Sequence, residues 1–279
     1  MPVVQRFLKA EMLTASSYIG GATQPGVTLQ GFLMNHTKTV SSVSTQLNVS
    51  SRLSRYQLPF ILGETNSLYN QGRPGLSNTF GAALWGLDFN LWCASNGIKR
   101  VHMHMGTSFR YISWQPIDTS STPKGTKAPY YGNIAVASAL GDITHNEVQV
   151  RNLPLSEYNE AAYATYVNST LKRVVVINMD SFNHTVNASG SVVRPVKQYS
   201  FSLPQSCAGT GIVQRLLANG SDAITGITWN GLSYNYELDQ GRPVRLSNTT
   251  QDTAVTVSEA GSLLVDVPHS SAAIVQLRC

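Results

Sequence analysis

The chain has 279 residues, of which 42% are hydrophobic and 13% charged, and its formal net charge is +5. This composition excludes a disordered chain, and the length is sufficient to bury a large core in one large domain or two medium ones. The basic residues are scattered, so no Lys/Arg run has the density of a nucleic-acid-binding stripe, and no stretch approaches the ~20 apolar residues of a membrane span.

The first half of the sequence alternates strand-like and helix-like segments. We expect strands at residues 27–35, 58–64 and 98–105, a weak helix at 37–53, and further helices at 77–97 and 130–141. The helix at 77–97 is the clearest, because large apolar residues from Phe80 to Leu91 recur on one face and Ser77 or Asn78 can cap its start. Strand and helix in alternation, with short connections, predict parallel βα units.

From about residue 155 the sequence changes to short β-rich runs separated by turn residues. We therefore expect an antiparallel β-sandwich over residues 151–279, preceded by a βα portion over residues 27–150. That portion has only about three strands, whereas a complete (β/α)8 barrel needs roughly 250 residues. The fold class predicted is thus α/β plus all-β, an incomplete (β/α)8 barrel containing its last strands, followed by a sandwich.

Seven Asn-x-Ser/Thr sequons favour a secreted glycoprotein. They stand at Asn35, Asn48, Asn168, Asn183, Asn187, Asn219 and Asn248. Residues 1–18 contain no apolar core of a signal peptide, so we expect the true start of the protein to lie upstream.

The three cysteines fit an oxidising compartment. Cys207 and Cys279 lie in the C-terminal third, and we expect a disulfide between them, although its geometry cannot be read from sequence. Cys93 falls inside a helical pattern and predicts a small buried hydrophobe. No Cys/His spacing resembles a zinc site, and we expect neither a metal nor a cofactor.

Glu64 follows an apolar run over residues 58–62, with only Gly63 between them. A buried carboxylate is costly unless it is paired, so either the strand ends in solvent there or the carboxylate is held at the mouth of a pocket. The C-terminal ends of parallel strands point to the active face of a βα fold. Other polar or flexible residues follow the predicted strand ends, namely Tyr69, Gly72, His102, His104, Arg110 and Tyr111. A carboxylate surrounded by such groups suits glycoside hydrolysis.

The stretch GETNSLYNQGRPGLSNTFGAALWGLDFNLWCASNGIKRVHMH, with APYYGN and RVVVINM further on, resembles the retaining glycosidases built on a (β/α)8 barrel plus a β-sandwich. More narrowly it resembles glycoside hydrolase family 79, the β-glucuronidases and heparanase-like enzymes, over most of residues 27–279. The resemblance implies that Glu64 is the catalytic nucleophile. It also implies that Tyr69 and Tyr111 hold the carboxylate of a glucuronic-acid-bearing glycan, as a tyrosine hydroxyl can donate to a carboxylate.

The sequence departs from this family in its acid/base residue. A retaining mechanism needs two carboxyl groups about 5–5.5 Å apart, and Glu11 is the only acidic residue before Glu64. Residues 1–26 look foreign to the barrel. We therefore expect the C-terminal part of a secreted exo-β-glucuronidase whose acid/base partner is missing. An inactive fragment, a glycan-binding module or a partner-dependent module is the alternative.

Each candidate residue also has an ordinary structural interpretation. Glu64 can be a solvent-facing acid, and Tyr69 and Tyr111 can be aromatics covering a barrel rim. We expect His104, rather than His102, to line the substrate pocket, and we expect Gly72 to line it as well.

Three further positions are expected to be structural. His36 reads as a loop residue beside a glycosylated Asn35, and Asp88 as a helix-surface or capping acid. Trp85 and Trp92 are expected to pack their helix against the barrel.

Overall fold

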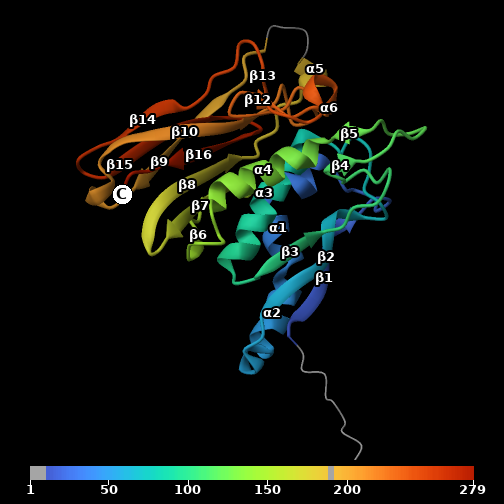
Figure 1. The fold of residues 1–279 in the computed structure, drawn as a ribbon, viewed down its shortest axis with the longest axis horizontal. Helices are drawn as coiled ribbons and strands as arrows, with labels where there is room; N and C mark the ends of the chain where they lie inside the picture. Colours follow the sequence, from blue (N-terminus) through green and yellow to red (C-terminus); the bar gives the residue numbers. More distant parts are fainter. Residues whose placement is uncertain (1–10, 188–191) are drawn as a thin grey trace, which may run out of the picture.

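The computed structural model describes residues 11–187 and 192–279 of the chain. In it, a small parallel sheet and a large antiparallel sheet lie on opposite sides of two central helices, α3 (Phe80–Ser95) and α4 (Ala128–Leu140) (Figure 1). Twelve of the 16 residues of α3 are buried, which is the pattern of a helix covered on all sides rather than on one stripe. The helices predicted at 77–97 and 130–141 are therefore confirmed.

The parallel sheet has the order β1-β2-β3. Its strands are β1 (Leu13–Gly21), β2 (Phe60–Tyr69) and β3 (Arg100–Met103). Two short helices, α1 (His36–Ser42) and α2 (Ser44–Arg52), precede β2, and α3 connects β2 to β3. A two-stranded hairpin of β4 (Trp114–Gln115) and β5 (Gly125–Thr126) stands in the loop before α4.

The structure corrects two boundaries predicted from sequence and shows one further strand. Residues 27–35 are not a strand, because Leu29–Leu33 form a short π-helix whose start is capped by the Thr28 hydroxyl. Within the segment 1–26, which looks foreign to the barrel in sequence, residues 13–21 form β1 and pair in parallel with β2; residues 1–10 are outside the described residues. The strand expected to stop at residue 64 continues to Tyr69.

The start of α3 also differs from the prediction. Thr79 is its N-cap residue, whereas Ser77 and Asn78 organise the preceding loop. The Ser77 hydroxyl accepts a hydrogen bond from the Arg73 amide at 3.1 Å, and the Asn78 side chain accepts one from the Gly75 amide at 2.7 Å. These two side chains therefore stabilise the loop that precedes α3, and they do not cap the first turn of the helix.

The second half of the chain forms the antiparallel sheet. Its strands are β6 (Val148–Asn152), β7 (Glu160–Val167), β8 (Thr170–Asn178), β9 (Val196–Ser202), β10 (Gly209–Leu217), β11 (Thr228–Trp229), β12 (Leu232–Ser233), β13 (Val244–Arg245), β14 (Thr253–Val257), β15 (Ser262–Pro268) and β16 (Ser271–Gln276). Short helical turns α5 (His184–Asn187) and α6 (Tyr236–Asp239) lie in its loops. Eight strands run in the order β13-β12-β11-β10-β16-β8-β7-β6, and β14, β15 and β9 continue from β10.

Side-chain alternation along the central strands creates two separate cores. In β8, Val175 and Ile177 join the core around α3 and α4, whereas Val174 and Val176 face Tyr199 and its neighbours in the second layer. A strand presents successive side chains to opposite faces, so the same strands serve both cores. The predicted antiparallel β portion is confirmed, and it packs on the helices through its central strands.

Candidate active site

The carboxylate singled out from sequence lies at a β-bulge in the middle of β2. Ala15 of β1 pairs with Leu62 and Ser16 pairs with Glu64, which leaves Gly63 as the extra residue. A side chain at Gly63 would overlap with the hydroxyl of Thr14 on the neighbouring strand, so the bulge requires glycine. Because the bulge shifts the alternation by one residue, Glu64 points to the exposed face of the sheet.

Tyr18 of β1 holds the Glu64 side chain. Its hydroxyl donates a hydrogen bond of 2.8 Å to Glu64 Oε1. Burial, and then the hydrogen bond to Glu64, raise the pKa of Tyr18 well above its usual value. The phenol therefore stays protonated at neutral pH and remains a donor to the carboxylate.

Aromatic side chains from three segments surround this pair. The Tyr18 ring lies 6.4 Å from that of Tyr69 and 6.5 Å from that of Tyr111, between centroids. Tyr69 is 46% exposed, whereas Tyr111 is buried. Burial, and then the charge of Glu64, raise the pKa of Tyr111 although its contact with Tyr18 opposes the shift. The structure thus brings Glu64, Tyr69 and Tyr111 together around Tyr18.

His104 also joins this group, just beyond the end of β3. Its Nδ1 lies 2.9 Å from the Tyr111 hydroxyl, and its ring is exposed. Phe109 packs against both, with ring centroids 5.7 Å from each. His102 is exposed on the same face, two residues earlier on the strand, and its ring makes no hydrogen bond to another described residue. His104 is therefore the histidine in contact with the candidate site.

Gly72 supports the site from behind. It is buried, has a φ of 75°, and a Cβ there would lie 2.9 Å from Ser77 Cβ and 3.1 Å from the Tyr111 ring. The position therefore needs glycine both for its backbone conformation and for the approach of Tyr111. A direct contact between Gly72 and substrate stays a prediction.

The face of the parallel sheet that carries Glu64 is open in the described part of the chain. Thr14, Ser16, Glu64, Arg100 and His102 are exposed on it. The opposite face packs against the helices through residues such as Ala15, Leu62 and Val101. Parallel sheets are usually covered on both faces. None of the hydrogen bonds of Glu64 within the described residues comes from a second carboxyl group.

Two residues expected to be peripheral instead contact each other, with Asp88 fully buried and His36 partly buried. Asp88 of α3 is 0% exposed, accepts a hydrogen bond of 2.6 Å from the Tyr163 hydroxyl, and lies 2.9 Å from His36 Nδ1. Asp88 is thus not a helix-surface acid, and His36 begins α1 rather than lying in a loop. A buried carboxylate needs such partners, and these come from α1 and β7. The three residues tie the helical layer to the antiparallel sheet.

The tryptophans and cysteines lie as expected. Trp85 is buried in the core around α3 and Trp92 packs against it. Cys93 is buried, and burial raises the pKa of its thiol. The predicted disulfide between Cys207 and Cys279 is present.

The sequons occupy different environments. The asparagines at 48, 168, 219 and 248 are exposed, whereas Asn35 and Asn183 are partly buried. Asn35 caps α1 through a hydrogen bond from the Lys38 amide at 3.0 Å. Asn187 ends α5, and its side chain is outside the described residues. Glycosylation at all of these positions stays a prediction.

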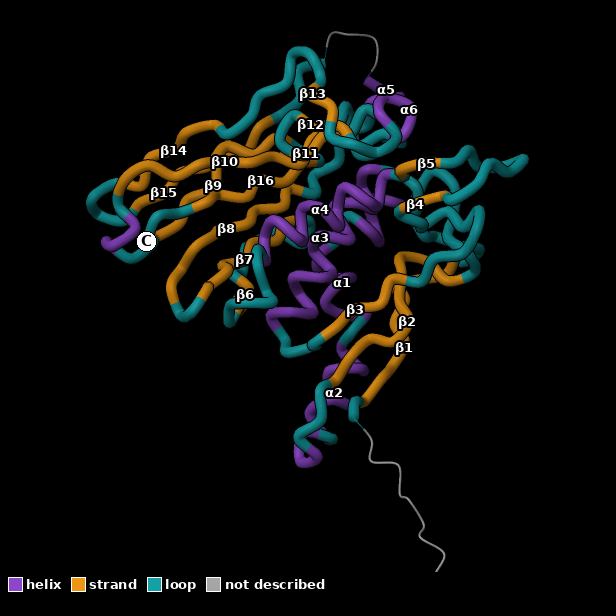
Figure 2. Tube along the Cα trace, viewed as in Figure 1, coloured by secondary structure: helices purple, strands orange, loops and turns teal. Residues whose placement is uncertain are grey.

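Sequence reasoning missed two residues that shape the site. Tyr18 was overlooked because β1 is polar and short of aliphatic residues, although LTASSYIGG alternates in burial. Asn66 is buried and donates hydrogen bonds to the carbonyls of His104 at 2.9 Å and Tyr111 at 3.4 Å. Asn66 therefore fixes the loop that carries the side chains of His104 and Tyr111. This loop lies with β4 and β5 beyond the ends of β1, β2 and β3 (Figure 2).

No group of three His, Cys, Asp or Glu side chains in residues 11–187 and 192–279 could hold a metal ion. In the same ranges, no helix has the length and apolar character needed to cross a membrane.

Residues 162–274 match the model of the Glycosyl hydrolase family 79 C-terminal beta domain. A β-glucuronidase of Aspergillus niger is 59% identical over 273 residues, covering 94% of this chain and 50% of that protein. A β-glucuronidase of Neurospora crassa is 52% identical over 268 residues, covering 86% of this chain and 48% of that protein. The chain thus spans about half the length of the curated relatives it matches.

Solved structures share the fold. The crystal structure of a 4-O-α-L-rhamnosyl-β-D-glucuronidase from Fusarium oxysporum 12S superposes with a TM-score of 0.78 at 23% identity, covering 95% of this chain and 53% of that one. An arabinofuranosidase superposes with a TM-score of 0.57 at 10% identity, covering 95% and 52%. The chain therefore resembles glycoside hydrolase family 79 through its C-terminal portion, and residues 162–274 match the C-terminal β domain of that family.

Proposed function

We propose that this chain is the nucleophile-bearing part of a retaining exo-β-glucuronidase that releases terminal glucuronic acid from glycans. One observation carries the proposal: Glu64 is exposed and held by the Tyr18 hydroxyl, in a chain 59% identical to a β-glucuronidase. In a retaining mechanism, a carboxylate oxygen of Glu64 attacks C1 of the sugar and the aglycone leaves, after which water releases glucuronic acid.

The neighbouring residues take supporting roles in this proposal. Tyr69 and His104 are exposed, and they contact Tyr18 and Tyr111, respectively. In this proposal they receive the carboxylate of the sugar. Tyr111 contributes through its hydroxyl, which bonds to His104, and Gly72 allows Tyr111 to approach. A phenol or imidazole N–H that donates to a carboxylate favours a uronic acid over the neutral sugar, which lacks that charge.

We also propose that the three parallel strands are the last strands of a (β/α)8 barrel. The open face that carries Glu64 supports this, because such a face is covered by further strands in a closed barrel. Polypeptide that completes the barrel would supply the acid/base carboxyl group. Such a carboxyl lies about 5–5.5 Å from the nucleophile in retaining enzymes.

The experiment that tests the nucleophile uses a substrate that needs no acid catalyst. Fluoride departs without protonation, so 2-deoxy-2-fluoro-β-glucuronyl fluoride can react with Glu64 even where the acid/base residue is missing. A Glu64 oxygen forms the bond to C1, and fluoride leaves with its electron pair. We expect peptide mass spectrometry of the folded chain to find the sugar on Glu64.

Glu64→Gln is the matched control, since an amide of the same size cannot attack. The corresponding glucosyl fluoride tests the uronic acid preference. A label on another residue, or an unlabelled folded chain, contradicts the nucleophile assignment. Equal labelling by the glucosyl reagent contradicts only the glucuronide specificity.

A partner-dependent module is the second candidate function, and the open sheet face favours it. In that case the chain binds a partner polypeptide. The complex of the two hydrolyses unfluorinated aryl β-glucuronides, which the chain alone leaves intact. Assaying the chain with and without the N-terminal half of a homologous barrel tests this second candidate, and a mixture that stays inactive contradicts it.

We propose further that the protein is secreted, on the basis of the disulfide and the four exposed sequon asparagines. Intact-mass measurement before and after enzymatic removal of N-glycans tests this on protein from its native source. A single unchanged mass contradicts the proposal.

A further inference from the structure

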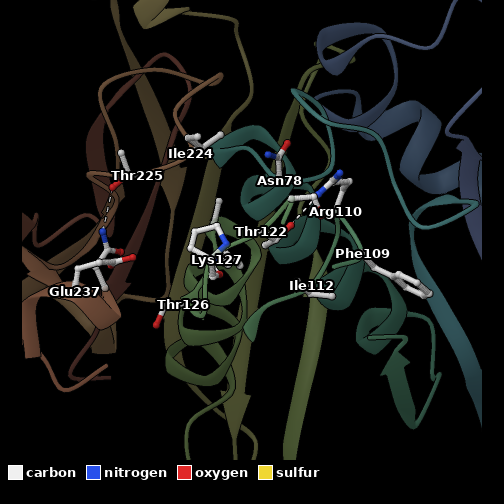
Figure 3. A pocket seen from close by; sticks show the side chains of 14 residues that line it. Asn78, Phe109, Arg110, Ile112, Thr122, Thr126, Lys127, Ile224, Thr225 and Glu237 are labelled. Carbon is white, nitrogen blue, oxygen red and sulfur yellow. Dashed lines mark hydrogen bonds between the residues drawn. The ribbon is translucent and has the colours of Figure 1, made fainter. Parts of the chain in front are cut away.

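A cavity of about 280 Å³ with both polar and apolar lining residues lies between the loop that follows β3 and a loop of the antiparallel sheet. We call it the junction pocket; Arg110, Thr122, Thr126, Lys127, Thr225 and Glu237 are among its lining residues (Figure 3). Its volume is just below the range of about 300–1,000 Å³ for small-molecule sites, so only a small ligand would fit.

The pocket borders the candidate active site without being part of it. Phe109 lines the pocket, and its ring also packs against Tyr111 and His104. Arg110 stands between Phe109 and Tyr111 in the sequence, and its amide donates a hydrogen bond of 2.6 Å to the Gln71 carbonyl. The loop that carries Phe109, Arg110 and Tyr111 thus stands between the junction pocket and the candidate active site.

Hydrogen bonds fix the walls before any ligand enters. Thr126 Oγ1 donates to the Tyr234 carbonyl at 2.7 Å, and the Tyr131 hydroxyl donates to the Asn235 side chain at 2.8 Å. Asn235 in turn donates to Thr225 at 3.1 Å. The loop of the antiparallel sheet is thus fastened to α4, so binding would require little further ordering.

The pocket holds two cations that have no carboxylate partner among the described residues. Arg110 donates one hydrogen bond of 2.8 Å to the Thr122 hydroxyl, and the Lys127 ammonium donates to the Pro123 carbonyl at 2.6 Å. Neither forms an ion pair within residues 11–187 and 192–279. Figure 3 shows Lys127 between Arg110 and Glu237, so the negative charge of Glu237 lies across the pocket from the guanidinium.

We propose that the junction pocket binds an acidic sugar unit, whose carboxylate or sulfate is received by Arg110 and Lys127. The guanidinium has donors left over for a planar anion, and the surrounding threonine hydroxyls and asparagine amides match sugar hydroxyls. Glu237 accepts hydrogen bonds from hydroxyls on the uncharged side of the sugar. The proposal goes beyond cleavage at Glu64, and it rests on the proposed function only for the class of glycan.

Binding of three probes to the 279-residue chain tests the assignment by calorimetry. The probes are an unsulfated glucuronic-acid disaccharide, its sulfated counterpart, and a neutral disaccharide of the same size. We expect at least one of the two acidic probes to bind. The neutral probe should bind at least tenfold more weakly than the stronger acidic probe. The stronger of the two acidic probes identifies carboxylate or sulfate as the preferred anion.

Three lysine and arginine variants locate the binding. Arg110→Met and Lys127→Met keep most of the side-chain length but remove the charge, and each is expected to weaken acidic-probe binding about tenfold. Lys124→Met is the matched control, because Lys124 lies three residues from Lys127 with its ammonium over the Tyr236 ring at 4.7 Å, outside the pocket lining. Its affinity should stay within twofold of the unmodified chain.

Binding by Glu64→Gln separates this proposal from the proposed function. An unchanged affinity in that variant, with loss only in the pocket variants, supports the junction pocket whatever the labelling of Glu64 shows. The pocket assignment is overturned if no acidic probe binds the folded chain, if the neutral probe binds equally well, or if Lys124→Met loses as much affinity as Lys127→Met.

Discussion

The hydroxyl of Tyr18 on β1 donates a 2.8 Å hydrogen bond to Glu64 on β2, so the candidate nucleophile is held from the neighbouring parallel strand. A carboxylate fixed in this way spends more of its time oriented for attack than one that rotates freely.

Tyr18→Phe should therefore slow the labelling of Glu64 by glucuronyl fluoride about tenfold, as expected for a lost hydrogen bond to a charged group. The rate is measured by intact mass against time. Tyr56→Phe is the control, since Tyr56 is 54% exposed in another part of the chain. An unchanged rate in Tyr18→Phe would show that the hydrogen bond does not position the nucleophile.

Gly63→Ala should disrupt the bulge and lower the free energy of unfolding by about 1–3 kcal/mol, because the added methyl overlaps with the Thr14 hydroxyl. The Thr14 Cβ would lie 3.4 Å from the new methyl, which is an acceptable contact. Thr14→Ala should thus restore most of the stability lost in Gly63→Ala. Urea denaturation of the two single variants and the double variant measures this coupling, and strictly additive losses would contradict the steric explanation.

The pairing of the partly buried His36 with the buried Asp88 should make stability depend on pH. Burial alone would lower the pKa of His36, but the hydrogen bond and the charge of Asp88 outweigh it and raise the pKa above its usual value of 6.5. A raised folded-state pKa means that the stabilisation is fully present below about pH 6.5 and is lost as the pH rises through the folded-state value.

Urea denaturation at several pH values from 5 to 8.5 checks this dependence. His36→Gln should flatten the curve, whereas His145→Gln should leave it unchanged, since the His145–Asp142 pair is exposed. A curve of the same shape in His36→Gln would assign the dependence to other groups.

The disulfide should contribute about 2–5 kcal/mol to stability, since Cys207 and Cys279 are 72 residues apart in the sequence. Replacing both cysteines with serine tests this by denaturation. Alkylation of the denatured chain should add one group without reduction, at Cys93, and three after reduction. Three additions without reduction would show that the disulfide does not form.

The sequence was sufficient for those features that depend on local chemistry. The long apolar pattern of α3 predicts a helix because it is far longer than a strand, and the β-rich runs after residue 155 predict the antiparallel sheet. Glu64 and Tyr69 were singled out through the stretch at residues 63–104 that contains them, and Tyr111 because it follows the last predicted strand of the βα portion.

Only the tertiary structure decided which residues meet across strands and layers. Tyr18 belongs to the site because β1 pairs with β2 in parallel, a contact between residues 46 apart that no local pattern contains. Asp88 looks like a surface acid on a helix, yet α1 and β7 bury it together with His36 and Tyr163. The cost of burying a charge is decided by its partners, and those partners are assembled only when the chain folds.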